Sequence, residues 1–442
     1  MDLNRRFRIS RDSKTAIVGG GGKTTLMFQL ARDFRSRVIC TTTTHLAMDQ
    51  LGSADQHLII TNLEDLSRTE ESYHGDVLLF TGPQVEPNRV GSPSPGILEL
   101  LSEIADDWGC PLIVEADGAR QLPIKAPAEH EPPIPDFIDT VFTVIGLSGL
   151  GKPLQEEWVH RPELYSRLVD LPLGEILESR HLVKGLISPD GGLKNIPQDA
   201  RRILLINQID SFPNWRTFYD QMDLLLEGYH AVGFSVLEDQ MLLEVHERIG
   251  CVVLAAGGSS RFGEPKQLLD WYGIPLVNHV AEIAIQAGLK PVVVVTGADH
   301  DGVSEALAGS PVEIVCNPGW GSGQSTSVRA GIEALSGCGL GGVVFLLVDQ
   351  PLIPPELIKK LVGQHQKNPS AIITPEVGGK AGNPVLFDRG AFDDLTRLGG
   401  DMGGRALFEK YPVRKVTWAD EKSQQDIDTP EDYQRIRFGE NG

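Results

Sequence analysis

Short apolar runs, each bounded by glycine, proline or charge, recur along the chain and predict buried strands. Clear examples are Lys14–Val18, Cys251–Leu254, Pro291–Thr296 and Gly342–Val348. Near-continuous runs of this kind are typical of parallel sheets, whose strands are covered on both faces. Segments with helical periodicity, such as Leu26–Ala31, alternate with them. The pattern predicts an α/β protein with two doubly wound domains and mainly parallel sheets.

The length of the chain and its internal boundary refine this picture. A chain of 442 residues is expected to form more than one domain. The second strand-and-loop pattern starts near Gly250, so we expect a first domain over residues 1–248 and a second over residues 249–442. Glu238–Arg248 is predicted to be the last helix of the first domain.

Composition excludes several classes of function. The net charge of −20 argues against nonspecific nucleic-acid binding, which needs a basic surface. The apolar runs are too short for membrane spans, and the first residues lack the apolar core of a signal peptide. The five cysteines are dispersed, without a C-x-x-C pair, as in a reducing compartment. We therefore expect a cytoplasmic protein that binds neither membranes nor nucleic acid.

The most informative stretch is Leu254–Leu269, a glycine-rich turn between a predicted strand and a helical pattern. Such a turn offers backbone N–H groups to phosphate oxygens, because glycine has no Cβ in the way. Arg261 and Lys266 add two positive charges beside the turn. This combination suits a nucleoside triphosphate whose leaving group is pyrophosphate. The candidate nucleotide-binding residues here are Leu254, Ala255, Ala256, Gly257, Gly258 and Ser259.

Two carboxylates are candidate metal ligands. Asp349 follows the predicted strand Gly342–Val348, and ligands of open α/β sheets bind at the C-terminal ends of strands. Mg²⁺ is commonly held by one or two carboxylates together with phosphates. Asp428 is a candidate second ligand, but Asp428-Thr-Pro-Glu also has the form of a helix start, with an N-cap followed by Pro and Glu. Both interpretations of Asp428 stay open at this point.

Together these motifs resemble the molybdenum cofactor nucleotidyltransferases over residues 249–437. The sequence Leu-Ala-Ala-Gly at Leu254–Gly257 is similar to the cytidylyl-transferring members, whereas guanylyl-transferring members usually carry Leu-Ala-Gly-Gly. Ser325 and Ser327 also match the cytidylyl type as nucleotide contacts, and that type commonly has Met in place of Gln324. The resemblance implies transfer of CMP from CTP to Mo-molybdopterin, with Mg²⁺ as cofactor. Its implied catalytic residues are Arg261, Lys266 and Asp349.

The same resemblance implies a region that faces the pterin acceptor. Gly382–Phe387 and Gly400–Arg405 match that part of the family, in which some members have His in place of Asn383. The implied nucleophile is the terminal phosphate of molybdopterin, which is already ionised near neutral pH, so no general base is required. The candidate acceptor-binding residues are Gly382, Asn383, Pro384, Asp401 and Arg405.

The first half contains a second phosphate-binding pattern. The predicted strand Lys14–Val18 leads into Gly19-Gly-Gly-Gly-Lys-Thr-Thr25 and a helical segment, which looks like a P-loop. Lys23 would reach the β- and γ-phosphates and the Thr24 hydroxyl would contact Mg²⁺. The strict motif requires Gly where Ile17 stands. The candidate contacts to a second NTP, either ATP or GTP, are Gly19, Gly20, Gly21, Gly22, Lys23, Thr24 and Thr25.

Further strand ends fit a P-loop fold. Pro111–Gly118 is a predicted buried strand that ends in acidic residues, as a Walker B element does. We assign Asp117 to Mg²⁺ or its water shell and Glu115 to the same cluster. Asn207 and Asp210 resemble the base-reading Asn-Lys-x-Asp motif of GTPases, with Gln in place of Lys. These two residues are candidate base contacts, with guanine suggested; a buried strand that ends in a polar turn is the alternative.

Residues 14–245 resemble the selenium-dependent hydroxylase accessory proteins of the YqeC type, through these motifs and through Glu129–Pro135 and Val159–Glu163. The resemblance implies a role in the maturation of molybdenum hydroxylases, with an apo molybdenum hydroxylase as a partner. Three histidines that recur in the resemblance lack the spacing of zinc ligands. Helix capping, backbone contacts and substrate contacts are all open for His45, His130 and His160.

The sequence therefore predicts a P-loop NTPase-like accessory domain followed by a Rossmann-like nucleotidyltransferase that acts on molybdopterin. One alternative is transfer of another nucleotidyl group, such as GMP to molybdopterin or NMP to a sugar phosphate. A second alternative is a delivery chaperone that holds finished cofactor for an apo-hydroxylase.

Overall fold

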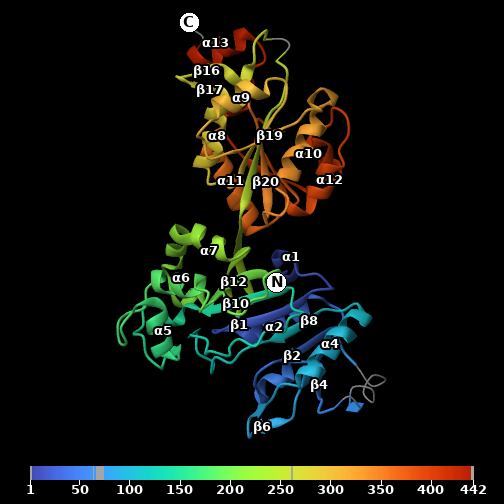
Figure 1. The fold of residues 1–442 in the computed structure, drawn as a ribbon, viewed down its shortest axis with the longest axis vertical. Helices are drawn as coiled ribbons and strands as arrows, with labels where there is room; N and C mark the ends of the chain where they lie inside the picture. Colours follow the sequence, from blue (N-terminus) through green and yellow to red (C-terminus); the bar gives the residue numbers. More distant parts are fainter. Residues whose placement is uncertain (1, 63, 66–73, 260–261, 440–442) are drawn as a thin grey trace. The chain divides into compact units, whose positions relative to one another are not determined.

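The computed structural model describes residues 2–62, 64–65, 74–259 and 262–439 (Figure 1). The chain divides into two compact units, Met1–His246 and Glu247–Gly442. Each unit has a central, mostly parallel sheet with helices on both faces, so the predicted α/β fold class is confirmed. Among the residues just given, no helix is long and apolar enough to cross a membrane.

The central sheet of the first unit has nine strands within the described residues, in the order β14-β13-β12-β10-β1-β8-β2-β5-β4. The neighbouring pairs from β13 to β4 are parallel. The strands are β1 (Lys14–Gly19), β2 (Val38–Thr42), β4 (Gln56–Ile59), β5 (Val77–Thr81), β8 (Leu112–Glu115), β10 (Thr140–Gly146), β12 (Arg201–Asn207), β13 (Ala231–Val236) and β14 (Met241–Glu247).

Helices bury both faces of this sheet, which explains the continuous apolar runs. Ile17 and Phe142 pack in a cluster with residues of α1 (Leu3–Phe7) and α2 (Lys23–Asp33) on one face. Ala16 and Val141, which point the opposite way, pack in a cluster with residues of α4 (Pro95–Trp108). A third cluster holds residues of α5 (Pro162–Val169), α6 (Ser179–Ile187) and α7 (Met222–Gly228).

Two small sheets accompany the central one. One pairs β9 (Ile124–Lys125) with β11 (Val159–His160) in parallel. The other has the order β3-β7-β6, with strands Leu46–Ala47, Arg89–Val90 and Gln84–Glu86. The first of these lies near the P-loop, where it contributes Lys125 and His160 to the candidate site described below.

The second unit has an eight-stranded sheet of mixed direction within the described residues, with the order β19-β18-β15-β20-β23-β21-β22 and with β24 beside β21. Strands β19, β18, β15 and β20 are parallel, whereas β23 runs antiparallel to β20 and β21. The strands are β15 (Ile249–Ala255), β18 (Val292–Thr296), β19 (Glu313–Cys316), β20 (Gly342–Leu347), β21 (Ile372–Val377), β22 (Lys380–Ala381), β23 (Val385–Asp388) and β24 (Val413–Thr417). A hairpin of β16 (Asp270–Trp271) and β17 (Ile274–Pro275) follows the glycine-rich loop.

Helices again cover both faces. Residues of α8 (Leu276–Gln286), α9 (His300–Ala306) and α11 (Pro355–Lys367) share one core cluster. Residues of α10 (Gln324–Ala334) and α12 (Phe392–Thr396) share another. The last helix, α13 (Pro430–Phe438), contributes Tyr433 to a small cluster with Trp271.

The helix predicted over Glu238–Arg248 is wrong, because the segment forms strand β14 beside β13. A turn precedes the strand: Gln240 adopts a left-handed φ of 53° and its N–H donates to the Leu237 carbonyl oxygen at 3.0 Å. Leu242 and Leu243 then pack on different core clusters. Successive side chains of a strand point to opposite faces, so these two leucines reach opposite sides of the sheet.

Candidate active sites

The glycine-rich loop after β15 is held in place by a buried glutamine. The Gln267 side chain, 2% exposed, donates through Nε2 to the Ala255 oxygen at 2.9 Å and to the Gly257 oxygen at 2.7 Å. The Lys266 backbone N–H donates to the Ser259 hydroxyl at 2.9 Å. The loop is therefore fixed at both ends before any ligand arrives. Arg261, one of the predicted catalytic residues, lies outside the described residues.

Lys266 joins the two predicted metal-ligand carboxylates. Its Nζ lies 3.2 Å from Asp349 Oδ2 and 3.2 Å from Asp428 Oδ1, and it donates to the Ile427 oxygen at 2.8 Å. Asp349 follows β20, and Asp428 precedes α13. The helix N-cap is Thr429, whose hydroxyl accepts from the Asp432 N–H. The helix-start interpretation therefore applies to Thr429 and leaves the Asp428 carboxylate directed at Lys266.

A third carboxylate, not singled out from the sequence, lies beside this pair. Asp426 accepts from the Gln350 side chain at 2.6 Å. Burial raises the pKa of Asp426, the Gln350 hydrogen bond opposes that rise, and the negative charges of Asp349 and Asp428 add to it. The negative charges of Asp349 and Asp428 therefore reach Asp426, and the positive charge of Lys266 opposes them.

Lys266, Asp349 and Asp428 line a cleft of about 550 Å3. Trp320, 39% exposed, stands at one side, and a Cβ added to Gly258 would lie 3.0 Å from its ring. Glycine at this position therefore lets the indole approach the loop. The residues of the cleft that the sequence had predicted are Leu254, Ala256, Gly257, Gly258, Ser259, Lys266, Ser327, Asp349, Asp401 and Asp428.

The paired serines of α10 are in different surroundings. The Ser325 hydroxyl is 1% exposed and donates to the Gly400 oxygen at 2.6 Å, so it ties the helix to the loop before Asp401. Ser327 lines the cleft and its hydroxyl accepts from Asn317 Nδ2 at 2.9 Å. Of the two, Ser327 is the one that lines the cleft.

Gly323→Ala is expected to lower the melting temperature of the second unit. Gly323 has a φ of 112°, and an added Cβ would lie 2.3 Å from the Gly400 oxygen. A non-glycine residue in such a conformation costs on the order of 1–3 kcal/mol, before the steric clash is counted. Differential scanning fluorimetry measures the shift. Gly321→Ala is the matched control, because a Cβ there meets nothing within 4 Å; equal melting temperatures for the two variants would contradict this account.

Three of the five predicted acceptor-binding residues lie between β22 and β23, and a fourth, Arg405, contacts one of them. The Asn383 oxygen Oδ1 accepts from Arg405 Nη2 at 3.1 Å, and the Asn383 backbone N–H donates to Gln424 Oε1 at 2.9 Å. Asp401 lies near the start of α10, where its Oδ1 accepts from the Gln324 N–H at 3.4 Å. Gly382 and Pro384 flank Asn383, and a Cβ on Gly382 would collide with Gln424. The structure thus brings Asn383 and Arg405 into contact.

In the first unit, the segment Gly19–Gly22 connects β1 to α2 as a tight loop. The N–H groups of Gly20 and Gly21 donate to the Val144 oxygen at 2.8 Å and the Leu122 oxygen at 3.1 Å. These two amides hold the loop to its neighbours. The first N–H groups of a helix lack intrahelical partners, so the free donors lie at Lys23–Thr25, the start of α2.

Lys23 and Thr24 contact the acidic end of β8. The Thr24 hydroxyl donates to Glu115 Oε2 at 2.7 Å, and Lys23 Nζ lies 3.7 Å from Glu115 Oε1 and 3.4 Å from Asp117 Oδ1. Burial disfavours the Lys23 charge, but Asp117 and Glu115 outweigh it and raise the pKa of Lys23. Burial also raises the pKa of Glu115, although Lys23 and Thr24 oppose that rise.

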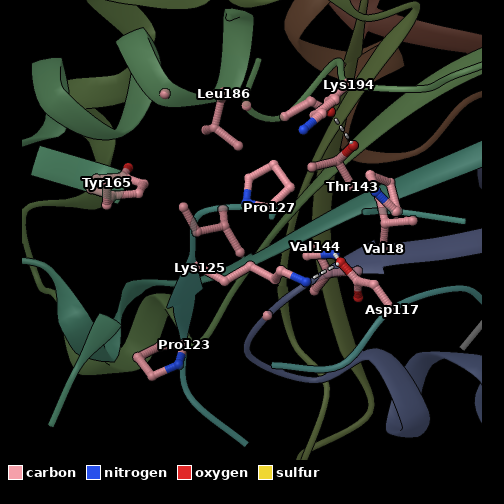
Figure 2. Close-up of a pocket in the computed structure, with 17 residues that line it drawn as sticks. Val18, Asp117, Pro123, Lys125, Pro127, Thr143, Val144, Tyr165, Leu186 and Lys194 are labelled. Atoms are coloured by element: carbon pink, nitrogen blue, oxygen red, sulfur yellow. Dashed lines mark hydrogen bonds and ion pairs between the residues drawn. The ribbon is translucent and has the colours of Figure 1, made fainter. Parts of the chain in front are cut away.

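The Asp117 carboxylate is bound by a backbone N–H group and by a lysine side chain. Its Oδ2 accepts from the Gly19 N–H at 3.0 Å and lies 2.9 Å from Lys125 Nζ. Figure 2 shows Asp117 and Lys125 at a pocket that Gly19 and Gly20 also line. Lys125 also lies 2.8 Å from Glu131 Oε2. Glu115 is thus the carboxylate in contact with the Thr24 hydroxyl, whereas Asp117 connects the P-loop to Lys125.

The two residues of the GTPase-like motif differ in burial. Asn207 is 3% exposed; its Nδ2 donates to the Gly21 oxygen at 2.7 Å, and its Oδ1 accepts from the Leu237 N–H at 2.9 Å. Asp210 is exposed in the turn that follows. Asn207 therefore supports the P-loop from the end of β12, as the alternative of a buried strand that ends in a polar turn expects.

A large polar cavity of about 860 Å3 adjoins the P-loop. Gly21–Thr25 and Glu115 line it together with His45, Arg120, His160 and Arg161. His130, the third histidine of the sequence resemblance, is exposed. Among the described residues, no group of three or more His, Cys, Asp or Glu side chains is arranged to hold a metal ion. A metal at either loop would therefore depend on phosphate and water oxygens for the rest of its ligands.

The fold of the second unit and the comparisons with known proteins define a nucleotidyltransferase. Residues 251–416 match the family model described as the MobA-like NTP transferase domain, and residues 15–163 match that of the YqeC protein. The chain belongs to both families, to the YqeC family through its first unit and to the MobA-like NTP transferase family through its second.

Individual relatives match one unit each. The YqeC protein of Escherichia coli (strain K12) is 32% identical over 208 residues, which cover 46% of this chain and 79% of the relative. Nicotine blue oxidoreductase of Paenarthrobacter nicotinovorans is 31% identical over 195 residues, which cover 42% of this chain and 94% of the relative. A crystal structure of Rv0371c from Mycobacterium tuberculosis H37Rv shares 30% identity, with a TM-score of 0.39 and coverage of 43% of this chain and 97% of that one.

Proposed function

We propose that the second unit transfers CMP from CTP to Mo-molybdopterin, which gives molybdopterin cytosine dinucleotide and pyrophosphate. The observation that carries the proposal is the convergence of Lys266, Asp349 and Asp428 beside the glycine-rich loop. A positive side chain and two carboxylates in a cleft of about 550 Å3 suit a metal-assisted reaction between two anions. The membership in the MobA-like NTP transferase family supports the reaction class.

The carboxylates fit a divalent cation. The Lys266 ammonium group lies 3.2 Å from an oxygen of each, which shows that the two can approach one positive centre together. Asp349 and Asp428 would hold Mg²⁺ together with phosphate oxygens, in line with the preference of Mg²⁺ for hard oxygen ligands. When bound, the ion supplies neutralisation of the charge that develops on the phosphates.

Residues of the chain itself bind and align the two substrates. The phosphate oxygen of molybdopterin forms a bond to the α-phosphorus of CTP, and the bond to the bridging oxygen of pyrophosphate breaks. Lys266 binds triphosphate oxygens, and the loop Ala256–Ser259 offers backbone donors from its fixed position. Arg261 keeps its proposed role at the triphosphate. Alignment and charge stabilisation are the main contributions in such a transfer, since no covalent intermediate is needed.

Substrate selection is assigned to Ala256, Ser327 and Asp401, which line the cleft, and to Asn383 and Arg405. The cytosine assignment rests on Ala256, where guanylyl-transferring relatives usually carry Gly, and on Ser327 within the cleft. Asn383, Arg405 and Asp401 are proposed to bind the pterin side, supported by the contact between Asn383 and Arg405. Gly382 and Pro384, which flank Asn383, are proposed to bind the acceptor with it.

For the first unit we propose NTP binding in the service of molybdenum hydroxylase maturation, over residues 1–248, with residues 249–442 as the transferase. The N–H groups at the start of α2 and the Lys23 ammonium would hold the phosphates of ATP or GTP. Thr24 and Glu115 fit Mg²⁺, because their oxygens lie 2.7 Å apart at the loop; Asp117 would act through the water shell. A client apo-hydroxylase in the cytoplasm completes the proposal.

Product analysis tests the transferase assignment. The full chain is incubated with Mo-molybdopterin, Mg²⁺ and CTP, and the products are separated and weighed by mass spectrometry. We expect the cytosine dinucleotide and one pyrophosphate for each molecule formed. Pyrophosphate release that does not depend on molybdopterin, or a nucleotide joined only to a sugar phosphate, would contradict the proposal.

A further inference from the structure

The cavity beside the P-loop is larger than a site for nucleotide phosphates needs. Its volume of about 860 Å3 lies near the upper end of the range of about 300–1,000 Å3 typical of small-molecule sites. Gly21–Thr25 and Glu115 form one side, and Arg120, His160 and Arg161 line the same cavity. If the first unit binds an NTP as proposed above, Arg120 and His160 remain available to a second ligand, with the paired Arg161 beside them.

The part of the cavity that carries His160 and Arg161 is firmly connected to the P-loop. Strand β11 pairs with β9 so that His160 stands beside Lys125. Lys125 lies 2.9 Å from Asp117 and 2.8 Å from Glu131. Arg161 donates to both oxygens of Glu131, at 2.6 and 2.8 Å. This chain of ion pairs is mostly buried, so the position of His160 is fixed relative to the loop.

His160 is a group able to accept a proton there. Its side chain is half-buried and lines the cavity, and it has no hydrogen-bond partner among the residues that the structure describes. Burial, helped by the positive charges of Arg161, Lys125 and Arg120, lowers the pKa of His160 to about 4. The imidazole is therefore neutral near pH 7, and the negative charge of a bound NTP would raise its pKa and make it a better proton acceptor.

The backbone of Arg120 adopts a conformation that residues other than glycine rarely adopt. Its φ is 51°, and Gln121 beside it has a φ of 62°. Two successive residues other than glycine in the left-handed region are unfavourable, and such conformations are concentrated at functional sites. Arg120 is exposed to the cavity and makes no ion pair with another described residue. Its planar guanidinium group suits the oxygens of a transferring phosphoryl group.

We propose that the first unit is a phosphotransferase, which moves the γ-phosphoryl group of an NTP to a small neutral alcohol bound at Arg120, His160 and Arg161. The alcohol oxygen forms a bond to the γ-phosphorus, and the bond between that phosphorus and the β-phosphate oxygen breaks. The NDP leaves with the bonding electrons, and the hydroxyl proton passes to the His160 imidazole. Arg120 stabilises the charge on the moving group.

The charges of the cavity favour a neutral acceptor over a polyanion. Glu131 and Glu115 are paired with Arg161 and Lys23, and Glu86 is paired with Arg89. Three more carboxylates line the cavity, and Arg120 is the one cation of its lining for which no ion pair is found among the described residues. The three carboxylates belong to Glu156, Glu163 and Glu238.

The test uses the full chain with Mg²⁺, ATP labelled with ³²P at the γ-position, and a panel of glycerol, ribose, glucose, inositol and serine. We expect a labelled, acid-stable phosphomonoester with at least one of these probes, formed in step with ADP. Release of inorganic phosphate in step with ADP, with no ester from any probe, would overturn the proposal and make the unit a hydrolase. Failure to consume bound ATP at all would overturn it too.

Variants separate transfer from nucleotide binding. His160→Ala is expected to lower ester formation about 10²-fold, the size typical of a lost acid–base group, while the Kd for a fluorescent ATP analogue changes less than about threefold. Arg120→Ala is expected to behave likewise, and Arg180→Ala, an exposed arginine of α6 paired with Glu178, should match wild type. Equal losses of ATP binding and turnover in His160→Ala would overturn the acceptor site. Absence of ATP binding to the wild-type chain would instead refute the proposed NTP-binding function.

Discussion

Asp349→Asn is expected to lower the rate of cytidylyl transfer by about 10²–10³-fold, the loss typical of one preorganised electrostatic group. The change keeps the volume of the side chain and removes its negative charge. Asp349 is the less exposed of the two carboxylates at Lys266, with 26% of its side chain exposed against 54% for Asp428. It is therefore the stronger candidate for the first metal ligand. Steady-state rates at saturating and limiting Mg²⁺ measure the effect.

The control for this variant is Asp393→Asn, in the exposed first turn of α12. It makes the same chemical change outside the cleft, so its rate should equal that of wild type. The melting temperature of Asp349→Asn should also stay close to wild type, because no core volume is lost. Full activity of Asp349→Asn at limiting Mg²⁺ would rule out a role in metal binding.

Lys23→Ala is expected to weaken NTP binding by the first unit at least about 100-fold, while cytidylyl transfer by the second unit continues. Lys23 is 6% exposed and is the one cation that contacts both Glu115 and Asp117 within the described residues. Its removal leaves two carboxylates to repel the phosphates of the incoming nucleotide. A fluorescent ATP analogue reports binding, and pyrophosphate release reports transfer.

Lys184→Ala serves as the control for Lys23→Ala, since Lys184 is an exposed lysine that pairs with Asp170 on the surface. Each unit has its own phosphate-binding loop and its own acidic strand end, so the two activities should separate. A loss of cytidylyl transfer in Lys23→Ala as large as the loss of NTP binding, with the fold intact, would show that the two sites act as one.

Local patterns were sufficient to predict the central strands and the two loops. Runs such as Lys14–Val18 and Gly342–Val348 are apolar throughout because helices cover both faces of each sheet. The helix predicted over Glu238–Arg248 failed for a related reason. Leu242 and Leu243 pack against core clusters on opposite faces of a sheet. Distant elements form these clusters, so the segment alone does not determine its own conformation.

Contacts between distant residues could not be predicted in the same way. Lys266 meets Asp349 and Asp428 across 83 and 162 positions of the chain, and only the family resemblance had brought these residues together. The hydrogen bond from the Asn207 side chain to the Gly21 oxygen joins residues 186 positions apart. The pairing of Lys125 with Asp117 and Glu131, and the buried role of Gln267, had no signal of their own in the sequence, because single lysines and glutamines are mostly exposed.

The most direct measurement of the central claim is a competition between CTP and GTP at equal concentrations, with Mo-molybdopterin and Mg²⁺ in excess and the full chain as enzyme. The ratio of cytosine to guanine dinucleotide gives the ratio of the two kcat/KM values. Our account predicts that the cytosine product dominates and that Asp349→Asn lowers the yield of both products by a similar factor. A guanine product in excess would contradict the assignment of CTP.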